Sequence, residues 1–266
     1  MSRLLAFVRR DTLAATSYKM AFAWQVGTLA SSILTVYFLS RMVRGGSIPA
    51  LAPWGGDYFA FAIVGVAFAD YLAVSLRGFS GGVRAAQMLG TLEAMLATPT
   101  SPAVIVLGSA LYPLLWSLLR VGVYIGSGVA LGARFPEANI PAAAATIALS
   151  VLAFGAVGML GASLVLVLKA WEPVTAFFSG ASVLLGGVLY PVSSLPGAAQ
   201  AASAALPMTH AIEAMRGALL AGRGIRDLAE PLGLLAAFTA LVLPVALWSF
   251  RRALHRLRID GSAGHY

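Results

Sequence analysis

Six long apolar runs limit what this chain can fold into more than any other feature of the sequence. An α-helix needs roughly 20 apolar residues to cross the hydrocarbon core of a membrane. Only 11% of the 266 residues are charged, whereas about a quarter of a soluble domain is charged. The sequence therefore predicts one all-α integral membrane domain over residues 1–266. We expect its six transmembrane helices at about 22–40, 58–76, 103–131, 142–168, 174–190 and 232–250.

Residues suited to helix starts stand just before these runs. Proline fits the first position of a helix, where its missing N–H would have no intrahelical partner. Asp57 is placed to cap the second span with its carboxylate. The prolines in this position are Pro102, Pro141, Pro173 and Pro231.

Basic residues predict the orientation, because they collect on cytoplasmic segments. With the N-terminus inside, the inner segments hold Arg3, Arg9, Arg10, Lys19, Arg77, Arg84, Lys169, Arg251, Arg252, Arg256 and Arg258. The outer segments hold Arg41, Arg44, Arg134, Arg216, Arg223 and Arg226. The excess lies inside, so both termini and the loop at 77–102 are expected in the cytoplasm. The net charge of +8 is explained by topology, and no nucleic-acid partner is expected.

The N-terminal residues 3–19 predict an amphipathic helix on the inner membrane surface. Leu4, Leu5, Val8 and Leu13 fall near one helical face among several charged residues. The alternative, a soluble arm, is less favoured because a span follows directly. The chain has no cysteine, which excludes disulfides, thiolate metal sites and cysteine nucleophiles. The few histidines and acids are scattered, so neither a metal site nor an enzyme active site is expected.

The loop after the second span contains a short amphipathic pattern at 85–96. This helix should end before Pro99, because the residue ahead of a proline avoids the α region. It is too short to span. The pattern alone fits two roles equally: a tether between spans, or a docking helix for a partner.

Two stretches favour docking, because they resemble a known family. GTLEAMLATPTS, from Gly90 to Ser101, is similar to the cytoplasmic loop of ABC-2 type transporter permeases. The segment from Leu184 to Gly222, with its Tyr-Pro-Val-Ser and Pro-Met-Thr-His motifs, is similar to the family's region around the fifth span. These permeases are membrane subunits of bacterial ATP-driven exporters in the plasma (inner) membrane.

The resemblance implies that residues 85–98 form a coupling helix docked on a separate ABC ATPase subunit. The chain has no G-x-x-x-x-G-K-[ST] loop, so we expect it to carry no cofactor, with ATP and Mg on the partner. Glu93 is the expected polar contact. The expected coupling residues are Met88, Leu89, Leu92, Glu93, Met95 and Leu96.

Residues 191–231 predict two short helices broken by proline, a pattern that fits a re-entrant hairpin buried in protein. The resemblance implies that this hairpin, between the fifth and sixth spans, closes the outer end of the export path. Its expected gate residues are Pro191, Pro196, Pro207, His210, Glu213 and Arg216. The last three are spaced by three, which favours an ion-pair network that fixes the hairpin over a proton relay.

Asp70 and Arg120 are the charged residues deepest in the predicted spans. Such charges are costly and usually face a partner or a water-filled cavity, so we expect an Asp70–Arg120 pair. Alternatively, Asp70 lies near the inner interface. The residues expected to line the export path are Thr28, Ser32, Tyr37, Tyr112, Trp116, Phe177 and Phe178.

The leading hypothesis is a permease subunit that exports an amphipathic or hydrophobic substrate, such as a drug, a lipid or a lipid-linked glycan. A polysaccharide export permease of the same family is the alternative. An ATP-independent transporter or channel is less favoured, because no internal repeat is evident. The second half of the pathway would come from another copy of this chain or from a related permease, with membrane lipids around both.

Overall fold

The computed structural model describes residues 12, 19–43, 49–88, 102–168 and 172–260. Within them the chain is helical and contains no β-strand, which confirms the predicted all-α class. The elements in order are α2 (Lys19–Val43), η1 (Pro49–Trp54), α3 (Tyr58–Met88), α5 (Pro102–Ala130), α6 (Ile140–Leu168), α7 (Glu172–Leu185), η2 (Val192–Ser194), α8 (Gly197–Ala204), α9 (Pro207–Leu220) and α10 (Ala229–Asp260).

Five of the described helices are long and apolar enough to cross a membrane. Their apolar segments are Phe22–Val43, Tyr58–Gly78, Leu111–Ala130, Ile140–Leu164 and Ala229–Ala253. The predicted span at 174–190 differs, because α7 has only 14 residues and ends at Leu185. Gly187 has a φ of 70°, a left-handed conformation that ends helices and favours glycine. This stretch is therefore a short helix followed by a turn.

Helix starts follow the expected chemistry. The Asp57 carboxylate accepts hydrogen bonds from the backbone N–H groups of Phe59 (2.9 Å) and Ala60 (3.3 Å), so it caps α3. Pro102 is the first residue of α5, and Pro207 is the first residue of α9. The far end of α3 differs from the predicted span, because the helix continues without a break to Met88.

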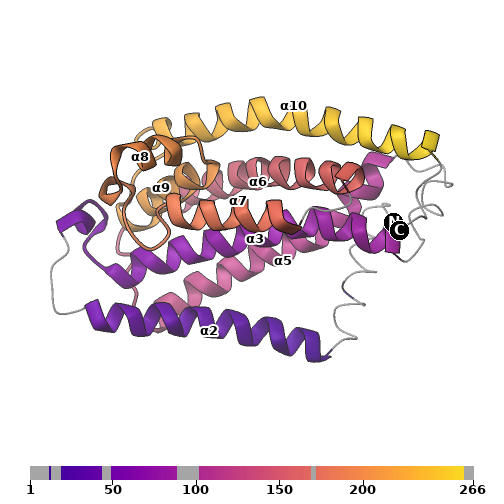
Figure 1. Ribbon diagram of the computed structural model, residues 1–266. Helices are drawn as coiled ribbons and strands as arrows, with labels where there is room; N and C mark the ends of the chain where they lie inside the picture. Colours follow the sequence, from indigo (N-terminus) through magenta and orange to yellow (C-terminus); the bar gives the residue numbers. More distant parts are fainter. Residues whose placement is uncertain (1–11, 13–18, 44–48, 89–101, 169–171, 261–266) are drawn as a thin grey trace.

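The long helices run side by side in one bundle (Figure 1). At one end, here called the hairpin end, η1, α8 and α9 gather beside the start of α3. At the other end, here called the loop end, α3 finishes and α5 begins. The start of α2 and the finish of α10 also lie at the loop end.

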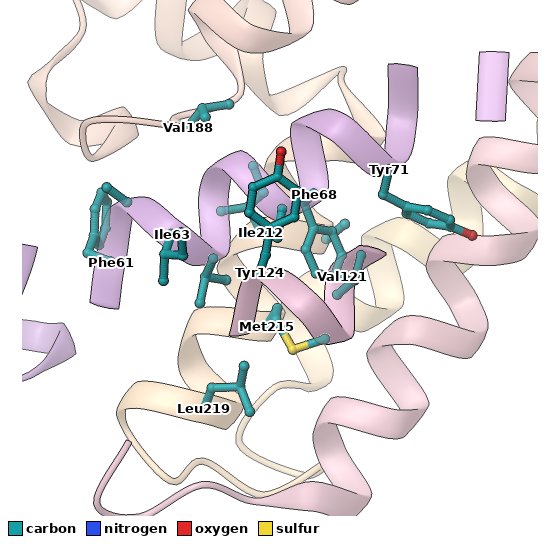
Figure 2. Packing of buried hydrophobic residues seen from close by; sticks show 14 of the residues in the cluster. Phe61, Ile63, Phe68, Tyr71, Val121, Tyr124, Val188, Ile212, Met215 and Leu219 are labelled. Atoms are coloured by element: carbon teal, nitrogen blue, oxygen red, sulfur yellow. The ribbon is translucent and has the colours of Figure 1, made fainter. Parts of the chain in front are cut away.

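The core is built around α3. Phe61, Ile63 and Phe68 of this helix are fully buried, and they lie among residues of α5 and α9 (Figure 2). Gly128 brings α5 close to α3, because a Cβ at this position would lie 3.3 Å from Ile63 Cγ2. Close packing of this kind stabilises helices in a membrane, where neighbouring lipid tails are as apolar as the side chains. Because α3 also runs from the hairpin end to the loop end (Figure 1), this central helix connects the two ends of the bundle.

Two helices at the edge of the bundle expose apolar side chains. Leu34 and Phe38 of α2 are exposed, as are Leu241 and Trp248 of α10. Large apolar residues on the outside of a bundle are expected where lipid replaces water. Among the described helices, α2 packs mainly against α3 and α5, so it lies apart from the rest of the core.

Two predicted features fall outside the described residues. The N-terminal interfacial helix at 3–19 lies there except for Thr12 and Lys19, and most of the predicted docking helix at 85–96 lies there as well.

Candidate functional site

A cleft between α2, α3 and α5 is the candidate functional site. It encloses about 600 Å³, within the range of small-molecule sites in proteins. On each helix the lining residues recur every three or four positions, because residues at this spacing share one helical face. The lining residues are Trp24, Gln25, Thr28 and Ser32 of α2, Asp70, Val74, Arg77 and Gly78 of α3, and Tyr112, Pro113, Trp116 and Arg120 of α5.

An ion pair joins α3 and α5 in the wall of this cleft. Arg120 Nε and Nη2 donate to the two carboxylate oxygens of Asp70, both at 2.7 Å. This is the bidentate geometry that makes arginine–carboxylate pairs strong. Both side chains are largely buried, with 11% of Arg120 and 17% of Asp70 exposed. The structure thus contains the Asp70–Arg120 pair that the sequence suggested.

An aromatic side chain joins α2 to α5 across the same cleft. Trp116 Nε1 donates to Gln25 Oε1 at 3.0 Å. The Phe22 and Trp116 rings lie 5.9 Å apart between centroids. These contacts are made by side chains alone, so α2 can shift relative to α5 without breaking any backbone hydrogen bond.

Two hydroxyl groups that α2 contributes to the cleft donate to carbonyls of their own helix. Thr28 Oγ1 donates to the Gln25 carbonyl (2.9 Å), and Ser32 Oγ donates to the Thr28 carbonyl (3.0 Å). Such bonds satisfy the hydroxyl hydrogen and leave the oxygen lone pairs able to accept. The face of α2 in the cleft therefore offers acceptors to a polar group.

A close approach of Gly78 to the Pro113 ring shapes one side of the cleft. A Cβ added to Gly78 would lie 2.6 Å from Pro113 Cβ, so a larger residue at this position would push α3 and α5 apart. Both residues line the cleft.

The structure brings together part of the predicted pathway. Thr28, Ser32, Tyr112 and Trp116 line the cleft along with the ion pair. The residues that sequence reasoning missed are Trp24, Gln25, Val74, Arg77, Gly78 and Pro113. Their signal was present, because Trp24, Gln25, Val74 and Pro113 lie three or four positions from residues already chosen on the same helices, and Arg77 and Gly78 lie two turns from Asp70.

The three other predicted pathway residues lie elsewhere. The Tyr37 hydroxyl accepts a hydrogen bond from Arg41 Nη2 at 2.5 Å. The Tyr37 ring packs on the Phe59 ring, with 5.6 Å between the ring centroids. Phe177 is 77% exposed on α7, and Phe178 packs against the core.

The predicted gate residues surround α9, whose residues are all buried except Glu213. Pro191 precedes η2, Pro196 precedes α8, and Pro207 begins α9. His210 Nε2 donates to the Ala204 carbonyl at 2.8 Å. Within the described part of the chain, no salt bridge joins His210, Glu213 and Arg216.

Arg216 instead binds backbone. Its guanidinium donates to the carbonyls of Phe61 (3.1 Å), Gly187 (2.7 Å) and Val188 (2.7 Å). Only 3% of the residue is exposed. Burial lowers the pKa of the Arg216 guanidinium from its ordinary value, and Tyr58 and Glu213 act in the opposite direction. The helix spacing that suggested an ion-pair network in fact presents Glu213 outward and Arg216 inward.

The sequence of residues 4–220 matches the ABC-2 type transporter family. The chain belongs to this family. Nodulation protein J of Bradyrhizobium diazoefficiens is 26% identical over 239 residues, which cover 90% of this chain and 89% of that protein. Nodulation protein J of Rhizobium leguminosarum bv. viciae is 27% identical over 264 residues, 95% of each chain. The similarity to both relatives thus extends over nearly their full length.

Membership in the ABC-2 family makes this chain a multi-pass membrane permease without ATPase activity of its own. ABC-2 permeases work with ABC ATPase subunits. Of the predicted coupling residues, Met88 is the last residue of α3, and Leu89, Leu92, Glu93, Met95 and Leu96 lie outside the described residues. Among the described residues, no group of three or more acids and histidines could hold a metal ion.

Proposed function

We propose that this permease exports an amphipathic substrate from the cytoplasm or the inner leaflet, driven by ATP hydrolysis on a separate ABC ATPase subunit. The observation that carries the proposal is the cleft between α2, α3 and α5. It combines tryptophan and tyrosine rings with hydroxyl, amide and ionic groups. Such a lining suits a molecule with one polar part and one apolar part.

The position of α2 supports a lipid-like substrate. The exposed Leu34 and Phe38 of α2 lie outside the lining of the cleft, whereas Thr28 and Ser32 belong to it. A polar headgroup could lie beside the ion pair while its apolar chain stays in the bilayer. A drug, a lipid and a lipid-linked glycan all fit this description.

Polysaccharide export is the second candidate, and the same cleft provides its support. Sugar rings stack on aromatic side chains and form hydrogen bonds with polar ones, and Trp24, Tyr112 and Trp116 lie beside Gln25. A polysaccharide would have no apolar tail, so stimulation of ATP hydrolysis by a water-soluble glycan would favour this candidate.

The orientation that we propose places the loop end in the cytoplasm and the hairpin end outside. Among the described residues, the loop end carries the basic residues Lys19, Arg77, Arg84, Arg251, Arg252, Arg256 and Arg258 with few acids. At the hairpin end, basic and acidic residues are balanced. Basic residues prefer the cytoplasmic side, so this contrast supports the orientation. It also supports a bacterial plasma (inner) membrane location with both termini inside.

A sixth crossing by the segment around α7 follows from this orientation. The chain leaves α6 at the loop end and begins α10 at the hairpin end (Figure 1). The segment between them must travel the length of the bundle, and α7 provides 14 apolar-rich helical residues for it. We propose that α8 and α9 then form a re-entrant hairpin that closes the outer end of the path.

Coupling to the ATPase is assigned to residues 85–98, with Glu93 as the polar contact. The unbroken run of α3 to Met88 supports this assignment, because a continuous helix transmits displacement from the loop end into the core. The complete pathway would pair this chain with a second copy or with a related permease. Alternating access would follow from rocking of the two halves.

The test is co-purification of the chain with its ABC ATPase, followed by ATP hydrolysis measurements in lipid vesicles. Glu93→Ala is compared with Glu137→Ala, an exposed acid at the hairpin end. We expect a stable complex whose ATPase activity is weakened or uncoupled only by Glu93→Ala. A complex that fails to form, or one in which the two variants behave alike, would contradict the proposed coupling.

A further inference from the structure

The Arg216 guanidinium connects two segments that are distant in the sequence. On one side it binds the Phe61 carbonyl in the first turn of α3. On the other side it binds the Gly187 and Val188 carbonyls in the turn after α7. Arg216 itself belongs to α9. One side chain therefore joins three parts of the hairpin end.

The surroundings of Arg216 fit an arginine and no smaller cation. Its guanidinium carbon lies 3.3 Å from the centroid of the Phe61 ring, a cation–π contact. Gly65 makes room on the next turn of α3, because a Cβ there would lie 2.6 Å from Arg216 Nη2 and 2.1 Å from the Val188 carbonyl oxygen. A planar fork of donors can bind several carbonyls in fixed directions, whereas a lysine ammonium acts as a point charge.

The Arg216 contacts end on the helix that passes through the whole bundle. From Phe61 and Gly65, α3 continues to Asp70 in the cleft wall and on to Met88 at the loop end. A helix with intact backbone hydrogen bonds resists stretching, so a movement of α3 at the loop end reaches its first turn. Whatever is fixed to that turn moves with it.

We propose that Arg216 is a positioning residue that locks α9 and the Gly187–Val188 turn onto α3, so that these parts move as one rigid body during transport. This inference rests on the proposed function, in which the hairpin end closes the export path. Movement of α3 then carries the hairpin directly. The flexible partner in the cycle is α2, whose described contacts through Trp116 of α5 are made between side chains.

Spin-label distances test this inference on the permease–ATPase complex. The native chain has no cysteine, so introduced cysteines are the sole labelling sites. One pair is placed at Gly81 of α3, where an added side chain meets open space, and at exposed Glu213 of α9. A second pair joins Glu213 to exposed Met42 of α2. Labelled chain is diluted with unlabelled chain, so that each distance is measured within one copy.

Distances are compared between the nucleotide-free and vanadate-trapped states. We expect the Gly81–Glu213 distance to stay fixed in the otherwise native chain while the Met42–Glu213 distance shifts. In the native chain the Gly81–Glu213 distance distribution should be a single narrow peak. In Arg216→Met this peak should broaden until it is lost, or it should shift between the two states. The matched control Arg226→Met, an exposed arginine at the same end, should behave as the native chain.

A Gly81–Glu213 distance that changes in the native chain would overturn the inference, as would a folded Arg216→Met with the native narrow peak. If Arg216→Met does not fold, Gly65→Ala disturbs the same contacts through its methyl group. The Gly81–Glu213 measurement in the otherwise native chain tests the inference even if neither variant folds. Loss of the complex or of its ATP hydrolysis would instead count against the proposed function.

Discussion

Two arginines in the interior of this permease show two ways to place a cation inside a membrane protein. Arg120 binds a carboxylate, Asp70, and lies in the wall of a cleft. Arg216 binds three backbone carbonyls and is almost fully buried. Each guanidinium has well-placed partners, but the partners differ in kind.

The difference indicates how each region works. Two side chains hold the pair in the cleft, so a substrate with its own charged group could compete for either partner. The carbonyls around Arg216 belong to the backbone, and no rotamer change can withdraw them. The ion pair in the cleft can therefore exchange one partner for a substrate group, whereas the Arg216 contacts at the hairpin end are suited to stay in place.

Removal of the Arg216 side chain should have the largest effect on stability. Arg216→Met leaves the buried Gly187 and Val188 carbonyls without their donor, whereas the Phe61 carbonyl keeps its bond within α3; each unsatisfied group costs about 1–3 kcal/mol. We expect the free energy of unfolding in lipid or detergent to fall by about 2–6 kcal/mol. Arg226→Met, which changes an exposed arginine, is the control. Equal stability of the two variants would show that the carbonyl contacts contribute little.

Substitutions in the Asp70–Arg120 pair should lower the free energy of unfolding less than Arg216→Met, because both side chains are partly exposed to the cleft. Asp70→Asn and Arg120→Met should each lower the free energy of unfolding by about 1–3 kcal/mol, since each leaves one charge unpaired. The double variant should cost less than the sum of the two. A double-mutant cycle measures this coupling, and strictly additive costs would refute a direct interaction.

Glycine-to-alanine changes compare packing at two positions. At Gly65 the new methyl group would lie 2.1 Å from the Val188 carbonyl oxygen, and at Gly126 it would meet open space. We expect Gly65→Ala to destabilise the fold by about 1–3 kcal/mol, the usual cost of overpacking. Gly126→Ala should be neutral or stabilising by up to about 1 kcal/mol, because alanine favours helix. Thermal unfolding of both variants measures the contrast, and similar shifts would contradict the close packing at Gly65.

The smallest effect is expected at Glu213. This residue is exposed and forms no salt bridge with Arg216 among the described residues. Glu213→Gln should change the free energy of unfolding by less than about 0.5 kcal/mol. A larger loss of unfolding free energy in the same assay would support the ion-pair network that the helical spacing suggested.

Much of the helix layout could be predicted, because its signals are local. Asp57 and Pro102 mark helix starts through hydrogen bonding and proline geometry, which act within one turn. The early end of α7 was missed, although the glycine pair at 186–187 carries the signal. Apolar length alone does not reveal that one of these glycines adopts a left-handed conformation.

The site was predictable where side chains act on side chains. Asp70 and Arg120 could be paired from the sequence, since two buried charges of opposite sign need each other. The partners of Arg216 could not be found in this way. Backbone carbonyls occur at every residue and leave no trace in the sequence, so the visible acid, Glu213, was the natural and mistaken choice.

Substrate-stimulated ATP hydrolysis by the permease–ATPase complex in lipid vesicles tests the central claim most directly. The probes are a lipid-linked oligosaccharide, an amphipathic cationic drug and a water-soluble polysaccharide. The account predicts that an amphipathic probe stimulates ATP hydrolysis. Trp116→Ala in the cleft should raise the probe concentration needed for half-maximal stimulation about tenfold. Trp248→Ala, an equal truncation on the exposed face of α10, should leave it unchanged. Equal stimulation of both variants by every active probe would show that the cleft does not receive the substrate.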